Sequence, residues 1–301
     1  QLAVTMSPTA RLLDFLAYKY KILFIISAGN HPEVVNFVGK SFDELKSLDM
    51  IQRSKVFGGI IKDNQRNLKI LAPAESLNGL TIGALYDDFT NTNETERRIL
   101  AVDRGLPSPI SAIGKGYRSV IAPDLFYYGG REFIRGKHNG EIDWVESSRE
   151  PGCLSAAPYG TGDIDGCAFS FGTSDAAAQI THEAAKCHDV LDQVFLNQTG
   201  TNMPVDSTAI LLKAMLAHGA SWKPIADKLA LTMGASPKQL SKWLGNGIPN
   251  INRVIECTKE RITLIGLGAL KKDKGDIFKL PLPVDFSTRL IKRRLTVTLS
   301  Y

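Results

Sequence analysis

The sequence has no long apolar run, no closely spaced cysteine pair and no excess of one charge. No stretch reaches the roughly 18 apolar residues needed to span a bilayer, so no membrane span is expected. Four cysteines without a CxxC pair are expected to be reduced, buried thiols, with Cys187 inside a helix. The net charge of +5 is dispersed. The basic clusters at 271–274 and 292–294 are interpreted as solvated faces, and nucleic acid is not an expected partner.

A composition of 44% hydrophobic and 22% charged residues over 301 positions predicts one large α/β domain followed by the start of a second. Helical and strand patterns alternate along most of the chain. Helices are predicted from Ser7-Pro8, from a Ser41/Glu44 capping box through Ile51, from Ser174 to about Phe195, and from Ser207 to His218. Buried strands are predicted at 21–26 and 80–85.

Beyond Cys257 the hydrophobic period shifts towards two, in residues 261–267, 277–280 and 293–299. We therefore place a domain boundary near residue 258, with residues 259–301 as a β-rich appended region. Residues 41–66 and 125–170 are interpreted as insertions, the second as a long surface or substrate-side loop rich in glycine, proline and aromatic residues.

The segment Gly172-Thr173-Ser174-Asp175-Ala176-Ala177-Ala178 places a serine where a glycine-bounded loop turns into a helix. The N–H groups of a first helical turn have no intrahelical partner and favour negative charge beside them. Ser174 is therefore a candidate nucleophile. The alternative is that the serine belongs to an ordinary helix cap.

The segment Ser27-Ala28-Gly29-Asn30 ends the predicted strand at 21–26. Small residues allow a sharp bend there, and the Asn30 amide at the strand tip supplies a neutral N–H donor of the kind that stabilises a tetrahedral oxyanion. Asn30 is therefore a candidate oxyanion donor. A turn capped by asparagine is the alternative.

Together these two segments resemble the subtilisin-like serine peptidases, the subtilases. Residues 71–85 are similar to the family's "PA…TVGA" strand entry, and residues 108–114 followed by Pro123-Asp124-Leu125 are similar to its "SxxSxxG…KPD" passage. The resemblance covers most of residues 8–258. It implies a three-layer α/β fold with a mostly parallel sheet for residues 1–258, and residues 280–283 and 293–299 resemble the β-region appended to some bacterial members.

The resemblance also implies a mechanism for a protein or peptide substrate. Ser174 would attack the scissile carbonyl while Asn30 Nδ2 and the Ser174 N–H hold the oxyanion. Gly172 and Thr173 would shape the approach, and Ser27, Ala28 and Gly29 would line the pocket of the residue before the scissile bond. The family's Asp and His precede its oxyanion Asn. None of the five histidines here has a "HGT" context, so the chain is expected to be a fragment cut at both ends.

The Ser174 segment departs from the family pattern at two positions. Ala178 replaces a usual proline, and this change should be mild because alanine is the best helix former. Asp175 replaces a large apolar residue and would oppose catalysis if its carboxylate faced the oxyanion, although it could point to solvent. A catalytically inactive subtilase-like binding or regulatory module is therefore the alternative function. An α/β-hydrolase esterase, suggested by Gly172-x-Ser174-x-Ala176, is disfavoured because no strong acid and histidine pair follows.

No cofactor is expected. His182 and His188 are six residues apart, so they project from nearly opposite helix faces and do not form a zinc site. Asp163-Ile164-Asp165-Gly166 has carboxylates at calcium-loop spacing but lacks the later ligands, which favours a polar turn over a calcium site. A bacterial cytoplasmic location is the preferred expectation.

Overall fold

The centre of the molecule is a parallel sheet of three strands, which confirms the expected α/β class. The computed structural model describes residues 5–145, 149–157, 164–258, 261–280 and 294–301. Strand β2 (Leu80–Leu85) lies between β1 (Ile25–Ser27) and β6 (Leu125–Tyr128), and all six of its residues are buried. Ile25 pairs with Leu80, and Ile82 with Leu125. The predicted strand at 80–85 is confirmed.

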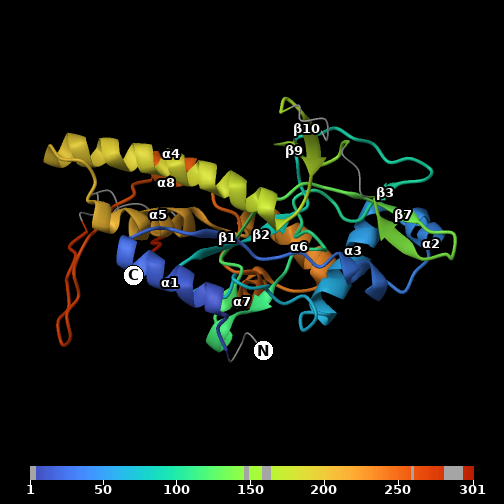
Figure 1. Ribbon diagram of the computed structural model, residues 1–301, viewed down its shortest axis with the longest axis horizontal. Helices are drawn as coiled ribbons and strands as arrows, with labels where there is room; N and C mark the ends of the chain where they lie inside the picture. The colour runs from blue at the N-terminus through green and yellow to red at the C-terminus, as the bar shows by residue number, and fades with distance from the viewer. Residues whose placement is uncertain (1–4, 146–148, 158–163, 259–260, 281–293) are drawn as a thin grey trace, which may run out of the picture.

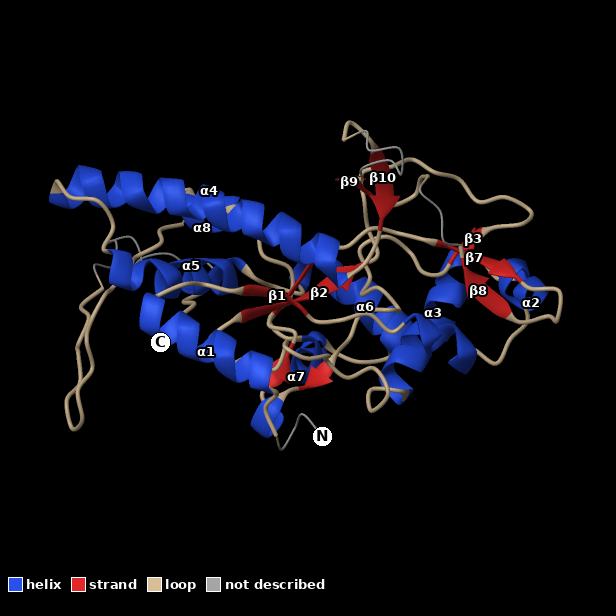
Figure 2. Cartoon of the chain, in the orientation of Figure 1, coloured by secondary structure: helices blue, strands red, loops and turns tan. Residues whose placement is uncertain are grey.

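Helices cover both faces of this sheet (Figures 1 and 2). Helix α4 (Thr173–Thr199) crosses all three strands on one face, and α5 (Val205–Gly219) lies beside it. Side chains of alternate residues of β2 pack there against Ala176 and Ile180 of α4. On the opposite face, Ile26 belongs to a separate cluster against which Leu13 of α1 (Pro8–Tyr20) packs. The sheet therefore brings the start of α4 to the carboxyl end of β1.

The local helix signals are mostly confirmed. The Ser7 hydroxyl caps α1 by accepting from the Ala10 N–H at 3.2 Å. The Ser41/Glu44 capping box opens α2 (Phe42–Ser47), but the prediction that this helix continues through Ile51 is wrong. Extended backbone at Leu48 ends α2, and a second capping box of Asp49 and Gln52 opens α3 (Met50–Asp63).

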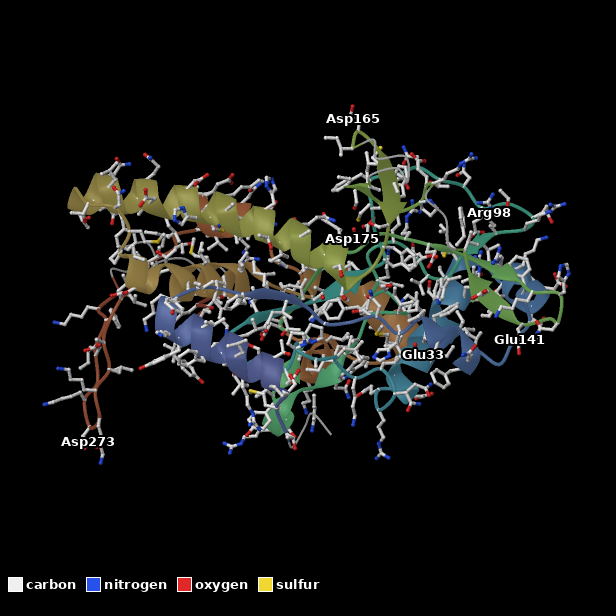
Figure 3. The ribbon with its side chains drawn as sticks, in the orientation of Figure 1. Glu33, Arg98, Glu141, Asp165, Asp175 and Asp273 are labelled. Carbon is white, nitrogen blue, oxygen red and sulfur yellow. The ribbon has the colours of Figure 1, made fainter. Side chains whose placement is uncertain are left out.

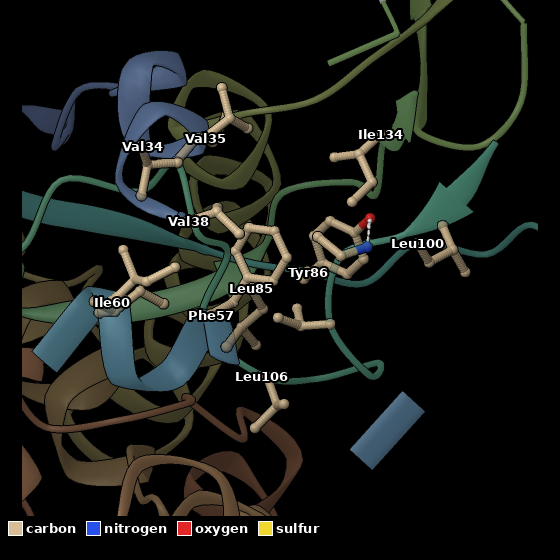
Figure 4. Close-up of a cluster of buried hydrophobic side chains, with 14 of the residues drawn as sticks. Val34, Val35, Val38, Phe57, Ile60, Leu85, Tyr86, Leu100, Leu106 and Ile134 are labelled. Carbon is tan, nitrogen blue, oxygen red and sulfur yellow. Dashed lines mark hydrogen bonds between the residues drawn. The ribbon is translucent and has the colours of Figure 1, made fainter. Parts of the chain in front are cut away.

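A second core forms around Phe57 of α3 and Tyr86, which follows β2 (Figure 4). The Tyr86 hydroxyl donates to the Glu132 carbonyl and accepts from the Ala101 N–H at 3.1 Å. Burial raises the pKa of Tyr86 far above its usual range. Ile134 and Trp144 are buried in the same core. Residues 41–66 and 125–145 thus both contribute buried apolar side chains to this core. The interpretation of 125–145 as a surface loop is therefore wrong, whereas the interpretation of both segments as insertions stays a prediction.

The remaining elements are short and surround these two cores. They are η1 (Pro32–Phe37), β3 (Ile99–Leu100), β4 (Gly114–Lys115), η2 (Tyr117–Ser119), β5 (Ile121–Ala122), β7 (Phe133–Gly136), β8 (Ile142–Trp144), β9 (Cys153–Ala156), β10 (Cys167–Ser170), η3 (Lys223–Ile225), α6 (Ala226–Met233), α7 (Pro237–Leu244) and α8 (Asn252–Ile255). Strands β9 and β10 form an antiparallel hairpin that precedes α4, and a substrate-side role of this segment stays a prediction.

The C-terminal region differs from expectation in its described residues. The predicted strands at 261–267, 277–280 and 294–299 are not strands there, and most large apolar residues in these stretches are exposed. Alternating apolar residues form a strand only when another strand supplies hydrogen-bond partners. No finding tests the boundary near residue 258, which stays a prediction.

The four cysteines are free thiols, as expected. Cys187 is buried within α4, but Cys167 and Cys257 are exposed, so the expectation of burial is wrong for these two. Within the described part of the chain, no helix combines the length and the apolar character required to cross a membrane.

Candidate active site

The loop after β1 is held in a single conformation by the backbone around it. The Ala28 N–H donates to the Ile82 carbonyl at 2.9 Å, and the Gly29 carbonyl accepts from the Ala112 N–H at 2.9 Å. Gly29 has φ +108°, and a Cβ at this position would lie 2.6 Å from the Leu71 side chain. Only glycine fits such a position. The turn therefore holds the half-buried Asn30 side chain in a fixed orientation at the carboxyl end of β1.

Two hydrogen bonds join this loop to the start of α4. Asn30 Oδ1 accepts from the Thr173 N–H at 3.0 Å, and the Gly29 N–H donates to Thr173 Oγ1 at 3.1 Å. Thr173 is fully buried, and so is Ala28. The predicted site residues Ala28, Gly29 and Thr173 thus fix the geometry between the two segments, and contact of these residues with substrate stays a prediction.

Gly172 lies directly against the Asn30 amide. Its φ is +139°, and a Cβ there would lie 2.7 Å from Asn30 Nδ2. Because Oδ1 is engaged by Thr173, the orientation of the amide is set, and Nδ2 occupies the space that a side chain at Gly172 would need. The glycine of the motif is therefore required both by the backbone conformation and by the amide beside it.

Ser174 is the second residue of α4, and its side chain is exposed. As a first-turn residue its N–H has no intrahelical acceptor, and within the described residues neither this N–H nor Ser174 Oγ has a hydrogen-bond partner. The structure thus places an exposed serine hydroxyl and its unpaired N–H two residues after Gly172, which lies against the Asn30 amide. Two N–H donors beside a hydroxyl are the arrangement that stabilises an oxyanion formed when the hydroxyl attacks a carbonyl.

The Asp175 carboxylate faces the β9–β10 hairpin and not Asn30. Its Oδ1 accepts from Ser170 Oγ at 2.6 Å and from Ser155 Oγ at 3.3 Å. Figure 3 shows Asp175 between the start of α4 and this hairpin. The carboxylate is therefore held by two hydroxyl groups, on a different side of Ser174 from the Asn30 amide. This orientation removes the main objection to catalysis that the sequence raised.

None of the five histidines, all of which the structure describes, has a hydrogen bond to Ser174. His31 directly follows Asn30, but its ring is already engaged. Nδ1 contacts Glu33 Oε1 and Nε2 contacts the Lys69 carbonyl, both at 2.7 Å, and the residue is 8% exposed. His31 thus anchors the loop after β1. The sequence did not indicate this role, since it depends on Lys69, which is distant along the chain.

Asp88 anchors the other side of the site region. Its fully buried carboxylate accepts from Arg131 Nε and Nη2, both at 3.0 Å, and from the backbone N–H groups of Thr90 and Gly152. Burial alone would raise the pKa of Asp88, but the hydrogen bonds from Arg131 and Thr90 outweigh it and hold this pKa below its ordinary value. The carboxylate thus ties the loop after β2 to the chain entering β9.

Asp88→Ala is expected to destabilise the protein by about 3–5 kcal/mol at neutral pH, because it leaves the Arg131 guanidinium buried without its partner. The folded-state pKa is lowered, so this stabilisation exists above the unfolded value of about 3.9 and is lost as the pH falls through the folded-state pKa. Urea unfolding at pH 7 and pH 3 measures both effects. Asp143→Ala, at the partly exposed pair with Lys137, is the control and should cost about 1 kcal/mol or less. Equal losses for the two variants would contradict this role of Asp88.

A metal centre is not evident. Among the described residues no group of three or more His, Cys, Asp or Glu side chains is placed to hold an ion. Asp163, the first carboxylate of the calcium-loop spacing at residues 163–166, lies outside the described residues.

The chain thus combines a parallel α/β sheet with a serine near a helix start and an asparagine amide held against the same helix start. Comparison with protein families identifies the family: the model of the subtilase family, peptidase S8, matches residues 5–247. The chain belongs to the subtilase family, whose members are serine peptidases. This confirms the resemblance drawn from the four sequence segments.

One curated relative adds no function to this assignment. It is the uncharacterised protein y4bN of Sinorhizobium fredii, 23% identical over 296 residues, which are 97% of this chain and 61% of that protein. The chain therefore spans about three fifths of the length of this relative. No solved structure matches the chain.

Proposed function

We propose that the protein is a serine endopeptidase in which Ser174 is the nucleophile and Asn30 supplies the oxyanion hole. The observation that carries the proposal is the 3.0 Å hydrogen bond from the Thr173 N–H to Asn30 Oδ1. This bond fixes the amide of Asn30 so that Nδ2 lies beside Gly172, two residues before Ser174. Asn30 Nδ2 and the Ser174 N–H would then both donate hydrogen bonds to the carbonyl oxygen on which negative charge develops.

The chemical step requires a general base that removes the Ser174 proton. Hydroxyl groups of serine are weak nucleophiles without one. Since no histidine of residues 1–301 contacts Ser174, the proposal assigns this role to a histidine, oriented by an aspartate, upstream of residue 1. Ser174 then attacks the peptide carbonyl, the histidine returns the proton to the leaving amine, and water releases the acyl group. Ser27 and Gly29 would lie beside the residue before the scissile bond.

Asn30→Leu in the full-length protein tests the assignment of the oxyanion donor. We expect kcat to fall by roughly 10²–10³, the effect known for this donor in subtilisin itself, with KM nearly unchanged. The reason is that Nδ2 donates to the oxygen mainly when that oxygen carries negative charge. Steady-state kinetics on a fluorogenic peptide separates the two constants. Asn197→Leu, at an exposed position near the end of α4, is the matched control and should alter neither. A loss confined to KM would assign Asn30 to substrate binding instead.

The second candidate is a subtilase-like module that binds peptides without cleaving them. The engagement of His31 by Glu33 and Lys69, and the absence of contact between Ser174 and any of the five histidines, favour it. A fluorophosphonate probe decides between the two with the full-length protein. Covalent labelling of Ser174 supports the peptidase, and peptide binding without labelling supports the module.

A further inference from the structure

A cavity of about 750 Å³ lies next to Ser174 and plays no part in the mechanism above. Its walls come from the loop after β2, the chain entering the β9–β10 hairpin, the hairpin itself and one face of the first turns of α4. The residues that define it are Phe89, Glu150, Cys153, Phe169, Asp175 and Gln179. Because Asp175 follows Ser174 directly, the cavity begins one residue from the proposed nucleophile.

The cavity extends from Asp175 towards the β9–β10 hairpin, and Asn30 is not among the residues that line it. Asn30 contacts the start of α4 through Thr173, whereas Asp175 reaches Ser170 on the hairpin. In the proposed function the residue before the scissile bond lies beside Ser27 and Gly29, on the Asn30 side. The peptide therefore continues past Ser174 towards the hairpin, and the residue after the scissile bond arrives at the cavity.

The lining combines apolar surface with negative charge. Phe89, Phe169 and Leu154 supply apolar walls, and Asp175 and Glu150 supply carboxylates. Among the residues described, no lysine, arginine or histidine lines the cavity, although the chain as a whole carries a net charge of +5. The Ser170 and Ser155 hydroxyl groups both donate to Asp175 Oδ1, so Oδ2 can accept a hydrogen bond from another donor.

Cys153 on the cavity wall responds to the same negative potential. Burial, and then the charges of Asp175 and Asp88, raise the pKa of its thiol to about 12. The neighbouring Gln179 Nε2 donates to Cys153 Sγ at 3.3 Å and to the Tyr128 carbonyl at 2.9 Å. Gln179 thus links Cys153 to the end of β6, and the carboxylates of Asp175 and Glu150 on the lining favour a positive over a negative occupant.

We propose that this cavity binds the lysine or arginine side chain of the substrate residue that follows the scissile bond. The methylene groups would lie on Phe89, which packs against Tyr128 on the cavity wall, and the cationic head would reach Asp175 Oδ2 with Glu150 nearby. The assignment rests on the proposed peptidase function and adds a substrate class to it. Asp175, at the position where the family has an apolar residue, becomes the determinant of this selectivity.

The test uses the full-length protein and three fluorogenic peptides that differ only after the scissile bond, with lysine, norleucine or glutamate there. Norleucine lacks the ammonium of lysine but has a similar apolar chain. We expect kcat/KM for lysine to exceed that for norleucine by on the order of tenfold, as for a charge-assisted hydrogen bond, and glutamate to be the poorest substrate. Asp175→Asn should bring the lysine to norleucine ratio close to one. Asp189→Asn, at an exposed position of the same helix, is the control and should keep the wild-type ratio.

Glu150→Gln is a second variant, useful because Asp175→Asn also alters the contacts with Ser170 and Ser155. It should lower the same ratio without touching those contacts. Cleavage of all three peptides with equal kcat/KM, or an unchanged ratio in both variants, would overturn the cavity assignment while leaving the peptidase intact. Failure to cleave any peptide, together with no fluorophosphonate labelling of Ser174, would instead overturn the proposed function and this inference with it.

Discussion

Replacement of Ser174 by alanine in the full-length protein should lower kcat by about 10⁶, the effect known for loss of the nucleophile in subtilisin. The fall is this large because the acyl-enzyme no longer forms, and only the oxyanion donors and substrate binding remain. The same replacement should abolish covalent labelling by a fluorophosphonate, read by intact mass. Peptide binding, measured with the variant by fluorescence anisotropy, should persist, since the Asn30 to Thr173 contact does not involve the Ser174 hydroxyl.

Ser207→Ala is the matched control for this experiment. Ser207 lies in the first turn of α5, as Ser174 lies in the first turn of α4, but it is not part of the proposed site. Its replacement should leave both kcat and labelling at wild-type levels. Persistent labelling in Ser174→Ala would show that another serine is the nucleophile, and the site at the start of α4 would then be misassigned.

Residues 1–301 expressed alone should neither hydrolyse peptides nor react with the fluorophosphonate, while the full-length protein does both. A serine hydroxyl needs an adjacent base to act as a nucleophile, and none of the five histidines in these residues contacts Ser174. The measurement is a labelling time course for the two proteins at equal concentration, with far-UV circular dichroism to show that the helices are present. Free oxyanion donors cannot compensate, because they stabilise charge only after attack has begun.

Covalent labelling of Ser174 in residues 1–301 would contradict this prediction. It would mean that one of these histidines reaches Ser174 in solution, and His31 would be the first to replace, because it follows Asn30. His31→Gln would then abolish labelling if His31 were the base. His188→Gln, an exposed position on α4, is the corresponding control.

The sequence predicted the site best where the determinants are local. Ser174 near a helix start and Asn30 after a strand both follow from neighbouring small residues, and the structure places the Asn30 amide against Gly172 and Thr173. The orientation of Asp175 could not be predicted, since it depends on Ser155 and Ser170, which reach it only when the hairpin packs beside α4. The same holds for His31, whose ring finds its acceptor at Lys69.

The fold shows the same division. The strand at 80–85 and the capped helices follow from local patterns and were predicted. The core around Phe57 and Trp144 was not, because it joins two segments whose composition resembles that of surface insertions. The alternating residues after 258 illustrate the opposite error: a period of two describes a half-buried face, but a strand exists only with a partner.

The 144 positions between Asn30 and Ser174 have a consequence for biosynthesis. Contacts between residues so far apart form late in folding, because the loop between them must close first. During synthesis the oxyanion loop leaves the ribosome long before the serine that it serves. For the peptidase proposed above, a nascent or half-folded chain would therefore hold only one half of the site, and cleavage could not begin on its own unfolded segments or on other chains emerging nearby. The timing of assembly would then act as a safeguard that a site built from adjacent residues would lack.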